Sequence, residues 1–568
     1  MPMLFTKRAP YHVRSLCTTT SKHLSRSKCA HSSPIPTISA RSVSLSSPLP
    51  KKQRKRSAPT SLVALATISA TLLAAWHSSC TLHAEAPPEQ EDDRDQNAKE
   101  DGLVDGTKRT FRLSDISAHD KDSQSPWVIK GTKVYDITDW IAGHPGGNVI
   151  LRAAGGSVEP YWNIFSIHKK QEVYDILEGF LIGHVDPQDL VDGQVPLDSI
   201  DDPFDQDPKR DQRLIVHTDK PMNAESPAPL LSTFVTPVDI FYVRNHLWVP
   251  RLVEKEHKLV VELDDGEEKE YTMSDLRNNF QQHKITATLQ CSGNRRSHMS
   301  QGSRHANGVQ WDAGAIGNAE WTGPRLRDVL ADAGFNVADP PDELQHVQFV
   351  GAEAYGASIP LAKAIDPRGD VILAHQMNGK TLSPDHGFPL RVIAPGHVAA
   401  RSVKWVHRVI LSEEESASQW QQRDYKCFGP NDTEKPNWER APAIQETPVQ
   451  SAITCMRREE GKEETKDVVI EGYAFSGGGR KIIRVDISTD NGGTWNQAET
   501  DIDPVNNGIR DWSWKRWKYV VPETKILGAT VVVKAVDEAY NTQPENHEPT
   551  YNIRGNLTCA WHRVKYDP

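Results

Sequence analysis

The sequence predicts a multidomain α+β protein that ends in an immunoglobulin-like β-sandwich. Its 568 residues are enough for roughly three or four domains of about 150 residues each. Between positions 212 and 441, short apolar runs alternate with Gly and Pro turns and a few helical stretches, which is typical of a large α+β domain. From position 442 onward the segments become β-branched or alternating, and Asp490–Gly493 is a strong hairpin-turn signal among them.

The individual elements follow from these local patterns. Apolar periodicity after Pro324 predicts a helix at 324–333. Period-two alternation and β-branched residues predict the C-terminal strands at 467–470, 482–488, 519–521 and 530–535. The seven cysteines show no paired spacing, which argues against a disulfide framework or a structural zinc site.

Residues 1–84 have the composition of a mitochondrial presequence. They contain 12 Lys or Arg residues and many Ser and Thr residues, and no acid precedes Glu85. Their apolar segment at 61–76 is short against the ~20 residues of a membrane-spanning helix. We therefore expect a sorting segment that is arrested at the inner membrane and removed, which leaves the mature protein in the mitochondrial intermembrane space. A retained anchor is the alternative, and only then would the protein contact a membrane.

The mature chain is strongly acidic. Because the leader carries 12 basic residues and no acid, the formal net charge changes from −10 to about −22 when it is removed. Such a surface repels nucleic acid and favours a basic protein partner. Residues 85–106 are acidic and predicted to be disordered, and residues 188–211 combine acids with prolines and predict a flexible linker. A linker of this length would let one domain swing on another.

A heme unit is predicted at 107–187. The turn His144-Pro145-Gly146-Gly147 is followed 24 residues after its histidine by His168, in apolar surroundings. This unit resembles the cytochrome b5 family, which implies heme b with His144 and His168 as the axial ligands of its iron. With both axial positions filled, the iron has no open site and can only shuttle single electrons.

A second motif, Cys291-Ser292-Gly293-Asn294-Arg295-Arg296, has the residues of a metal-thiolate site beside an anion trap. A single thiolate can hold a metal whose other ligands come from a cofactor and oxo groups. The guanidinium groups of Arg296 and of Arg244, in the run 242–246, suit a small oxyanion because they donate in a fork.

The region from about 241 to 568 resembles the eukaryotic sulfite oxidases, which are molybdopterin enzymes. The resemblance extends to six further motifs, at 355–360, 385–391, 423–426, 448–453, 472–479 and 552–555. It implies a molybdopterin-binding catalytic domain at 212–441 and an immunoglobulin-like dimerisation domain at 442–568, and hence a homodimer.

The resemblance also implies the role of each site residue. Cys291 would be the molybdenum ligand, and the sulfite pocket would be lined by Arg244, Arg296, Trp311, Tyr425 and Arg554. The cofactor would be held by Tyr242, Val243, Arg244, Asn245, His246, Cys291, Glu353, His386, Arg391, Ser402, Val403 and Lys404. Glu353 stands where the family pattern has an aspartate. His375 also departs from that pattern, and we assign it no role.

The implied reaction is the oxidation of sulfite to sulfate at the molybdenum centre, with water as the oxygen source. Electrons would pass one at a time through heme b to cytochrome c. One alternative is a nitrate reductase-like molybdoenzyme, but that family places its heme unit after the dimerisation region. The other is an inactive heme-binding redox scaffold, against which Cys291, Arg296 and Arg554 argue.

Overall fold

The computed structural model describes residues 109–567 with gaps at 145–146, 165–167, 169–170, 197–201, 354, 430–431, 433–435, 459–465, 501 and 505–509. The predicted presequence and the predicted acidic segment 85–106 lie outside the described residues. Within these ranges the elements mix helices and strands throughout, which confirms the α+β class. No helix among the described residues is long and apolar enough to cross a membrane.

The heme unit is built on a five-stranded sheet. Its strands, in the order in which they lie, are β1 (Thr110–Phe111), β5 (Leu181–Val185), β3 (Lys133–Asp136), β2 (Trp127–Lys130) and β4 (Gly156–Ser157). Val128 and Tyr135 of this sheet pack with Trp162 and Leu177 from the helical side. That side contains α3 (Glu159–Ile164), α4 (Gln171–Glu178) and 3-10 turns at Thr138–Gly143 and Gly147–Ala153, while α2 (Leu113–Ser117) follows β1.

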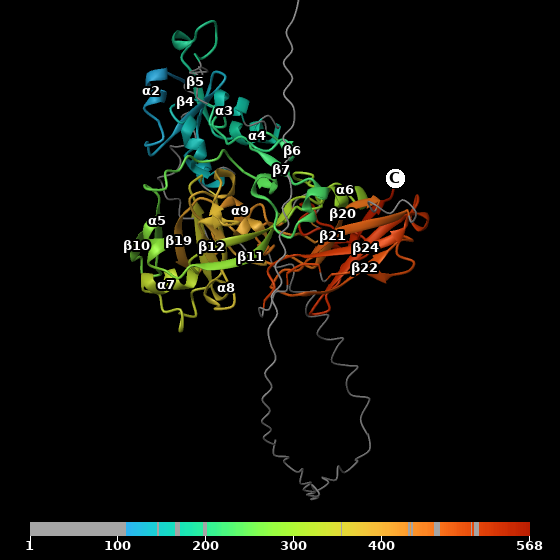
Figure 1. The fold of residues 1–568 in the computed structure, drawn as a ribbon. Coiled ribbons are helices and arrows are strands. Elements are labelled where there is room, and N and C mark those ends of the chain that lie inside the picture. The colour runs from blue at the N-terminus through green and yellow to red at the C-terminus, as the bar shows by residue number, and fades with distance from the viewer. Residues whose placement is uncertain are drawn as a thin grey trace, which may run out of the picture. The chain divides into compact units, whose positions relative to one another are not determined.

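The next region contains two larger sheets, drawn from green to yellow in Figure 1. The first has the order β10 (Glu268–Thr272), β9 (Lys258–Glu262), β19 (Val406–Ser412), β13 (His346–Gly351) and β14 (Gly356–Pro360). The second has the order β11 (His283–Gln290), β12 (Ile316–Gly323), β16 (Gln376–Met377) and β17 (Lys380–Thr381). Two small sheets complete it: β15 (Ile372–Ala374) with β18 (Arg391–Ile393), and β6 (Ile215–Thr218) with β7 (Asn223–Glu225) and β8 (Val243–Arg244).

Short helices cover these sheets. The predicted helix at 324–333 is present as α7 (Leu326–Ala333), and it ends because Gly334 adopts the left-handed conformation with φ 115°. Leu326, Val329 and Leu330 are its buried face. The other helices are α5 (Met273–Asn278), α6 (Arg296–Gly302), α8 (Leu361–Ile365) and α9 (Gln419–Gln422).

The C-terminal region contains two sheets that share one core. The first is β20 (Gln450–Arg458), β21 (Asp467–Phe475) and β24 (Lys515–Pro522), and the second is β23 (Asn496–Gln497), β22 (Ile482–Ser488), β25 (Thr530–Asp537) and β26 (His562–Lys565). Ile470 of the first sheet packs in one cluster with Ile487 and Val533 of the second. All four predicted strands are present, and β22 and β23 pair antiparallel around the predicted turn. The immunoglobulin-like type of this two-sheet unit stays a prediction.

Both described ends of the predicted linker, 188–196 and 202–211, contact folded parts of the chain. Asp189 forms an ion pair with Arg112 at 2.5 Å. At the other end, the Asp207 carboxylate accepts a hydrogen bond from the backbone N–H of Val249 at 3.0 Å, and Phe204 is buried. The linker is therefore fastened where it leaves the heme unit and where it enters the next region.

Ile470→Ala should lower the free energy of unfolding of the C-terminal region by about 2–5 kcal/mol, because it empties a fully buried site between the two sheets. The matched control is Val520→Ala on β24, since that side chain is 42% exposed and its loss should cost less than about 1 kcal/mol. Denaturant unfolding followed by fluorescence of the buried Trp514 and Trp517 measures both. Equal losses would contradict a core shared by the two sheets.

Candidate active site

The Cys291 loop leaves the end of β11 and returns to the start of β12. Two backbone-directed contacts hold it: the Cys291 N–H donates to the Ala315 carbonyl at 3.0 Å, and the Asn294 side chain accepts from the Ala315 N–H at 3.0 Å. Arg295 takes the left-handed conformation (φ 65°) that starts α6. Cys291 is 6% exposed. The antiparallel pair β11–β12 thus presents one buried thiol at its edge.

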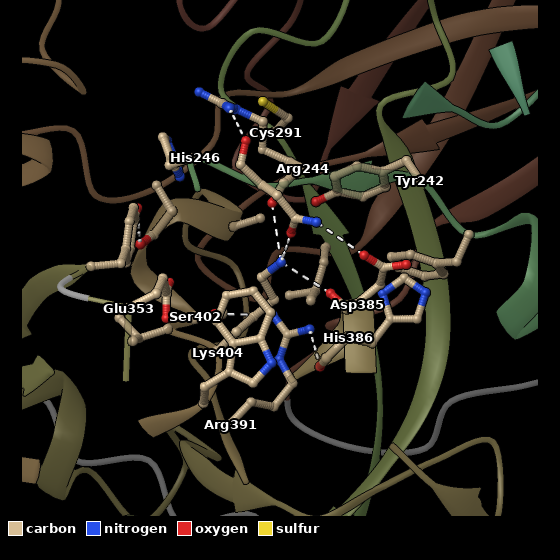
Figure 2. Close-up of a pocket in the computed structure, with 18 of the residues that line it drawn as sticks. Tyr242, Arg244, His246, Cys291, Glu353, Asp385, His386, Arg391, Ser402 and Lys404 are labelled. Carbon is tan, nitrogen blue, oxygen red and sulfur yellow. Dashed lines mark hydrogen bonds between the residues drawn. The ribbon is translucent and has the colours of Figure 1, made fainter. Parts of the chain in front are cut away.

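Cys291 lies in a pocket with most of the predicted cofactor residues, as Figure 2 shows. The exception is Val243. Tyr242 and Arg244 on either side of it face the pocket, so strand alternation turns Val243 away, into a small cluster with Leu214 and Met222. A cofactor contact by Val243 would have to use its backbone. The lining residues that were predicted are Tyr242, Arg244, Asn245, His246, Cys291, Glu353, His386, Arg391, Ser402, Val403 and Lys404.

Two buried cations in the pocket donate mainly to carbonyl oxygens. Arg391 donates to the carbonyls of His386 and Ser402, at 3.0 Å each. Lys404 Nζ donates to the carbonyls of Asp385 (3.0 Å) and Arg244 (3.2 Å) and to the side-chain oxygen of Asn245. Burial lowers the pKa of Lys404 to about 7 and that of Arg391 to about 10. Carbonyl dipoles orient these groups but do not neutralise their charge.

Burial makes the Glu353 carboxyl group harder to ionise. It is 8% exposed, and burial raises the pKa of its carboxyl to about 8, although Lys404 acts in the opposite direction. Its Oε2 atom is buried and has no hydrogen-bond partner among the described residues. The pocket therefore contains a buried acid with an unused oxygen, close enough to Lys404 for their charges to interact.

The histidines of the pocket are neutral. Burial lowers the pKa of His386 to about 4, and its Nε2 lies 3.2 Å from the Val238 carbonyl. Burial also lowers the pKa of His246, whose Nε2 lies 2.9 Å from the Tyr425 hydroxyl. Burial raises the pKa of Tyr425, so its hydroxyl stays protonated.

Arg296, Trp311 and Arg554 are not among the lining residues, but they are close to those that are. The charges of Cys291, Arg554 and Arg244 all act on the Arg296 guanidinium, whose pKa burial lowers. Arg296 donates to the carbonyls of Arg554 (2.8 Å) and Val309 (2.7 Å). Trp311 is fully buried.

Glycines make the space for Arg296. A Cβ atom on Gly293 would lie 2.5 Å from its guanidinium, one on Gly308 2.8 Å from it, and one on Gly555 2.6 Å from its Cγ atom. Gly308 and Gly555 also have positive φ angles of 125° and 55°. Any side chain at these positions would displace the arginine.

Several site residues were missed by the sequence reasoning. Asp424 pairs with Arg554, Asn223 accepts from Arg244 at 3.0 Å, and Asn556 accepts from Arg296 at 3.2 Å. Asp385 and Asp424 lie inside motifs that were noticed, at 385–391 and 423–426, and a search for carboxylates next to the arginines could have found them. Nothing in the local sequence marks Asn556.

His375 lies outside the pocket lining and is 4% exposed. Its Nε2 lies 2.8 Å from the Gln282 side-chain oxygen, and burial lowers its pKa to about 4. Arg295 is fully buried and donates to the Ser451 carbonyl at 3.2 Å.

The two predicted heme ligands face each other in the heme unit. The ring centroids of His144 and His168 are 6.1 Å apart, and their planes differ by 4°. Two metal–nitrogen bonds of roughly 2 Å each, with half a ring at either end, span about this distance. Trp162 stacks on His168 with centroids 5.3 Å apart. The two rings are thus parallel and lie at a separation that a metal between them would require, and their role as its ligands stays a prediction.

Three family descriptions match successive parts of the chain. Residues 112–186 match the cytochrome b5-like heme/steroid binding domain, residues 246–420 the oxidoreductase molybdopterin binding domain, and residues 441–568 the Mo-co oxidoreductase dimerisation domain. Sulfite oxidase from Gallus gallus is 44% identical, over 80% of this chain and 99% of the relative. The chain belongs to the sulfite oxidase family. Mitochondrial sulfite oxidase from Homo sapiens is also 44% identical, over 80% of this chain and 84% of the relative.

A solved structure shares the fold. The sulfane dehydrogenase SoxCD from Paracoccus pantotrophus aligns with a TM-score of 0.52 and 24% sequence identity, covering 62% of this chain and 86% of that one. At this identity the likeness concerns the fold alone.

Glu353→Gln should make the stability of the cofactor-free protein less dependent on pH. The folded-state pKa of Glu353 is raised above its ordinary value of 4.5, so the folded protein binds more protons than the unfolded chain between about pH 4.5 and 8, and stability falls as the pH rises through this window. Glutamine mimics the neutral acid. As the pH rises from 5 to 8, the unfolding temperature of the wild type should therefore fall relative to that of the variant.

The control for this experiment is Glu343→Gln, because Glu343 is exposed. Its unfolding temperature should follow that of the wild type at every pH. A difference between Glu353→Gln and wild type that stays constant from pH 5 to 8 would show that the Glu353 carboxyl is already ionised in the folded protein.

Proposed function

We propose that this protein oxidises sulfite to sulfate at a molybdenum centre and passes the electrons to its own heme b. The observation that carries the proposal is the buried Cys291 thiol in a pocket that Arg244, Arg391 and Lys404 also line. In the net reaction one sulfite and one water give sulfate, two protons and two electrons. The molybdenum of the bound cofactor supplies the two-electron redox chemistry, and the thiolate of Cys291 is its protein ligand.

The residues of the pocket fit a molybdopterin with its phosphate. Arg391 and Lys404 are held by carbonyl oxygens in the pocket, and a phosphate would accept charge-assisted hydrogen bonds from both. The unpaired Oε2 of Glu353 and the neutral His386 offer hydrogen-bonding groups to a polar heterocycle. We assign Tyr242, Asn245, His246, Ser402 and Val403 to the same cofactor, and Val243 through its backbone.

Sulfite would be held by Arg244, Arg296 and Arg554. The Nε of Arg554 is buried and has no hydrogen-bond partner among the described residues, so a bound oxyanion would satisfy it. Asp424 pairs with the other end of the same guanidinium and orients it. Tyr425 stays protonated and can donate to the anion or to His246, while the buried Trp311 closes the site from water.

Heme b would be held between His144 and His168 and would carry single electrons. We further propose cytochrome c as the acceptor that takes them, because the acidic mature chain attracts a basic partner. The protein is mitochondrial. We place it in the intermembrane space, because cleavage of a presequence that is arrested at the inner membrane would release the mature protein there. Its C-terminal two-sheet region would form the homodimer, as a dimerisation domain of immunoglobulin-like type.

Cys291→Ser should abolish sulfite oxidation while leaving the heme in place. A serine hydroxyl is a harder and less acidic ligand than a thiol, so it cannot replace the thiolate on molybdenum. The measurement is an optical spectrum before and after adding sulfite: the wild type should show heme reduction and the variant none. Cys455→Ser, on the half-exposed β20 position, is the control and should behave as wild type. Undiminished heme reduction in Cys291→Ser would refute the proposed function.

His168→Ala should remove the heme without removing sulfite oxidation at the other site. The two centres lie in separate units, so an artificial two-electron acceptor should still be reduced with sulfite while cytochrome c reduction falls by at least an order of magnitude. Heme content by absorbance and the two acceptor assays measure this. A variant that retains full heme content and full cytochrome c reduction would exclude His168 as an axial ligand.

A further inference from the structure

The last residues of the linker reach the wall of the cofactor pocket through Arg210. Its guanidinium forms a two-pronged contact with Asp385: Nε donates to Oδ2 and Nη2 to Oδ1, both at 2.9 Å. Nη2 also donates to Asp207 at 2.8 Å. The three side chains are 13%, 9% and 7% exposed for Arg210, Asp385 and Asp207. This is a buried charge cluster, unlike the exposed ion pairs that surround it.

Asp385 passes this contact on to the pocket. The Nδ2 of Asn245 donates to Asp385 Oδ1 at 2.9 Å, and the Oδ1 of Asn245 accepts from Lys404 Nζ. Lys404 donates in addition to the Asp385 backbone carbonyl at 3.0 Å. Figure 2 shows Lys404 at the centre of these dashed lines, with Asp385 at one end. A continuous series of hydrogen bonds therefore connects Arg210 at the end of the linker, through Asp385 and Asn245, to Lys404 in the pocket.

The electrostatics explain why Arg210 is needed. Burial alone would raise the pKa of the Asp385 carboxyl, but hydrogen bonding and charge from Arg210, followed by charge from Lys404 and His386, outweigh this effect, and the pKa lies below its ordinary value. Without Arg210 a buried carboxylate would face Lys404 with no other guanidinium to balance it among the described contacts. It would then either take up a proton and stop accepting from Asn245, or draw the Lys404 ammonium toward itself. Both changes move Lys404 from the position in which it can meet a phosphate.

We infer that Arg210 is a positioning residue for the cofactor: by neutralising Asp385 it holds Asn245 and Lys404 in place at the anion-binding end of the pocket. This inference rests on the proposed function, because it assumes that the pocket takes a molybdopterin phosphate. Arg210 belongs to the same stretch as Phe204 and Asp207, which fasten the linker next to Val249. The linker that follows the heme unit thus also supplies Arg210, which contacts the wall of the cofactor pocket.

The test compares Arg210→Gln with Arg213→Gln in the full-length holoenzyme. Arg213 is the matched control because it lies three positions away and its ion pairs with Asp211 and Asp239 are exposed. Both variants remove one positive charge from the same segment. The readout is the molybdopterin-to-heme ratio after prolonged dialysis, since heme in its separate unit serves as an internal standard for the amount of protein.

Arg210→Gln should lose molybdopterin roughly 10- to 100-fold faster than the wild type, the range observed when an outer partner of a metal site is removed. Arg213→Gln should retain it at the wild-type rate. Equal retention in all three proteins would overturn the inference. A wild type that contains heme but no molybdopterin and does not oxidise sulfite would instead overturn the proposed function, so the two failures are distinguishable.

A second variant separates positioning from simple anchoring of the linker. Arg210→Gln combined with Asp385→Asn removes both charges, and the asparagine oxygen can still accept from Asn245. If Arg210 acts by neutralising Asp385, the double variant should retain molybdopterin better than Arg210→Gln alone. Retention as poor as in the single variant would show that the arginine only anchors the linker, and the inference would then fail.

Discussion

The proposed chemistry of this protein depends on buried cationic groups that carbonyl oxygens hold in place at the wall of the pocket. Arg391 and Lys404 are oriented by carbonyl oxygens, and the nearby Glu353 is neutral because burial raises its pKa. Burying a charge without a counter-ion is costly. The anionic phosphate of a molybdopterin would lower this cost for Arg391 and Lys404.

The substrate side is assembled from parts of the chain that are far apart in sequence. Arg296 follows the cysteine loop, and its guanidinium is held by the carbonyl of Arg554 and the side chain of Asn556, close to the C-terminus. Gly555 leaves room for it. Formation of the proposed sulfite site thus requires that the C-terminal region packs against the segment that contains Arg296. Because Arg296 depends on contacts with Arg554 and Asn556, the site can form only after the C-terminal region has folded.

The division of the redox chemistry between two units follows from the chemistry of their ligands. A thiolate-bound molybdenum can change by two electrons, which the oxidation of sulfite requires, whereas an iron with two imidazole ligands exchanges one electron at a time. A linker must connect the two. Asp189 holds one described end of this linker, and Asp207 and Arg210 hold the other. The end next to the catalytic region therefore contacts the wall of the cofactor pocket through Arg210.

The sequence by itself determined the local elements and the chemical classes of both centres. The strand at 482–488 and the helix that ends before Gly334 could be read from periodicity and turn residues, because these signals lie within a few positions of each other. The motifs around His144 and Cys291 indicated the metal chemistry through their resemblance to known families. Only the tertiary structure decided which carboxylates pair with the arginines and which other residues support them. Arg210 and Asp385 are 175 positions apart, and Arg296 and Asn556 are 260 apart. Such pairs are created by packing, and no local pattern encodes them.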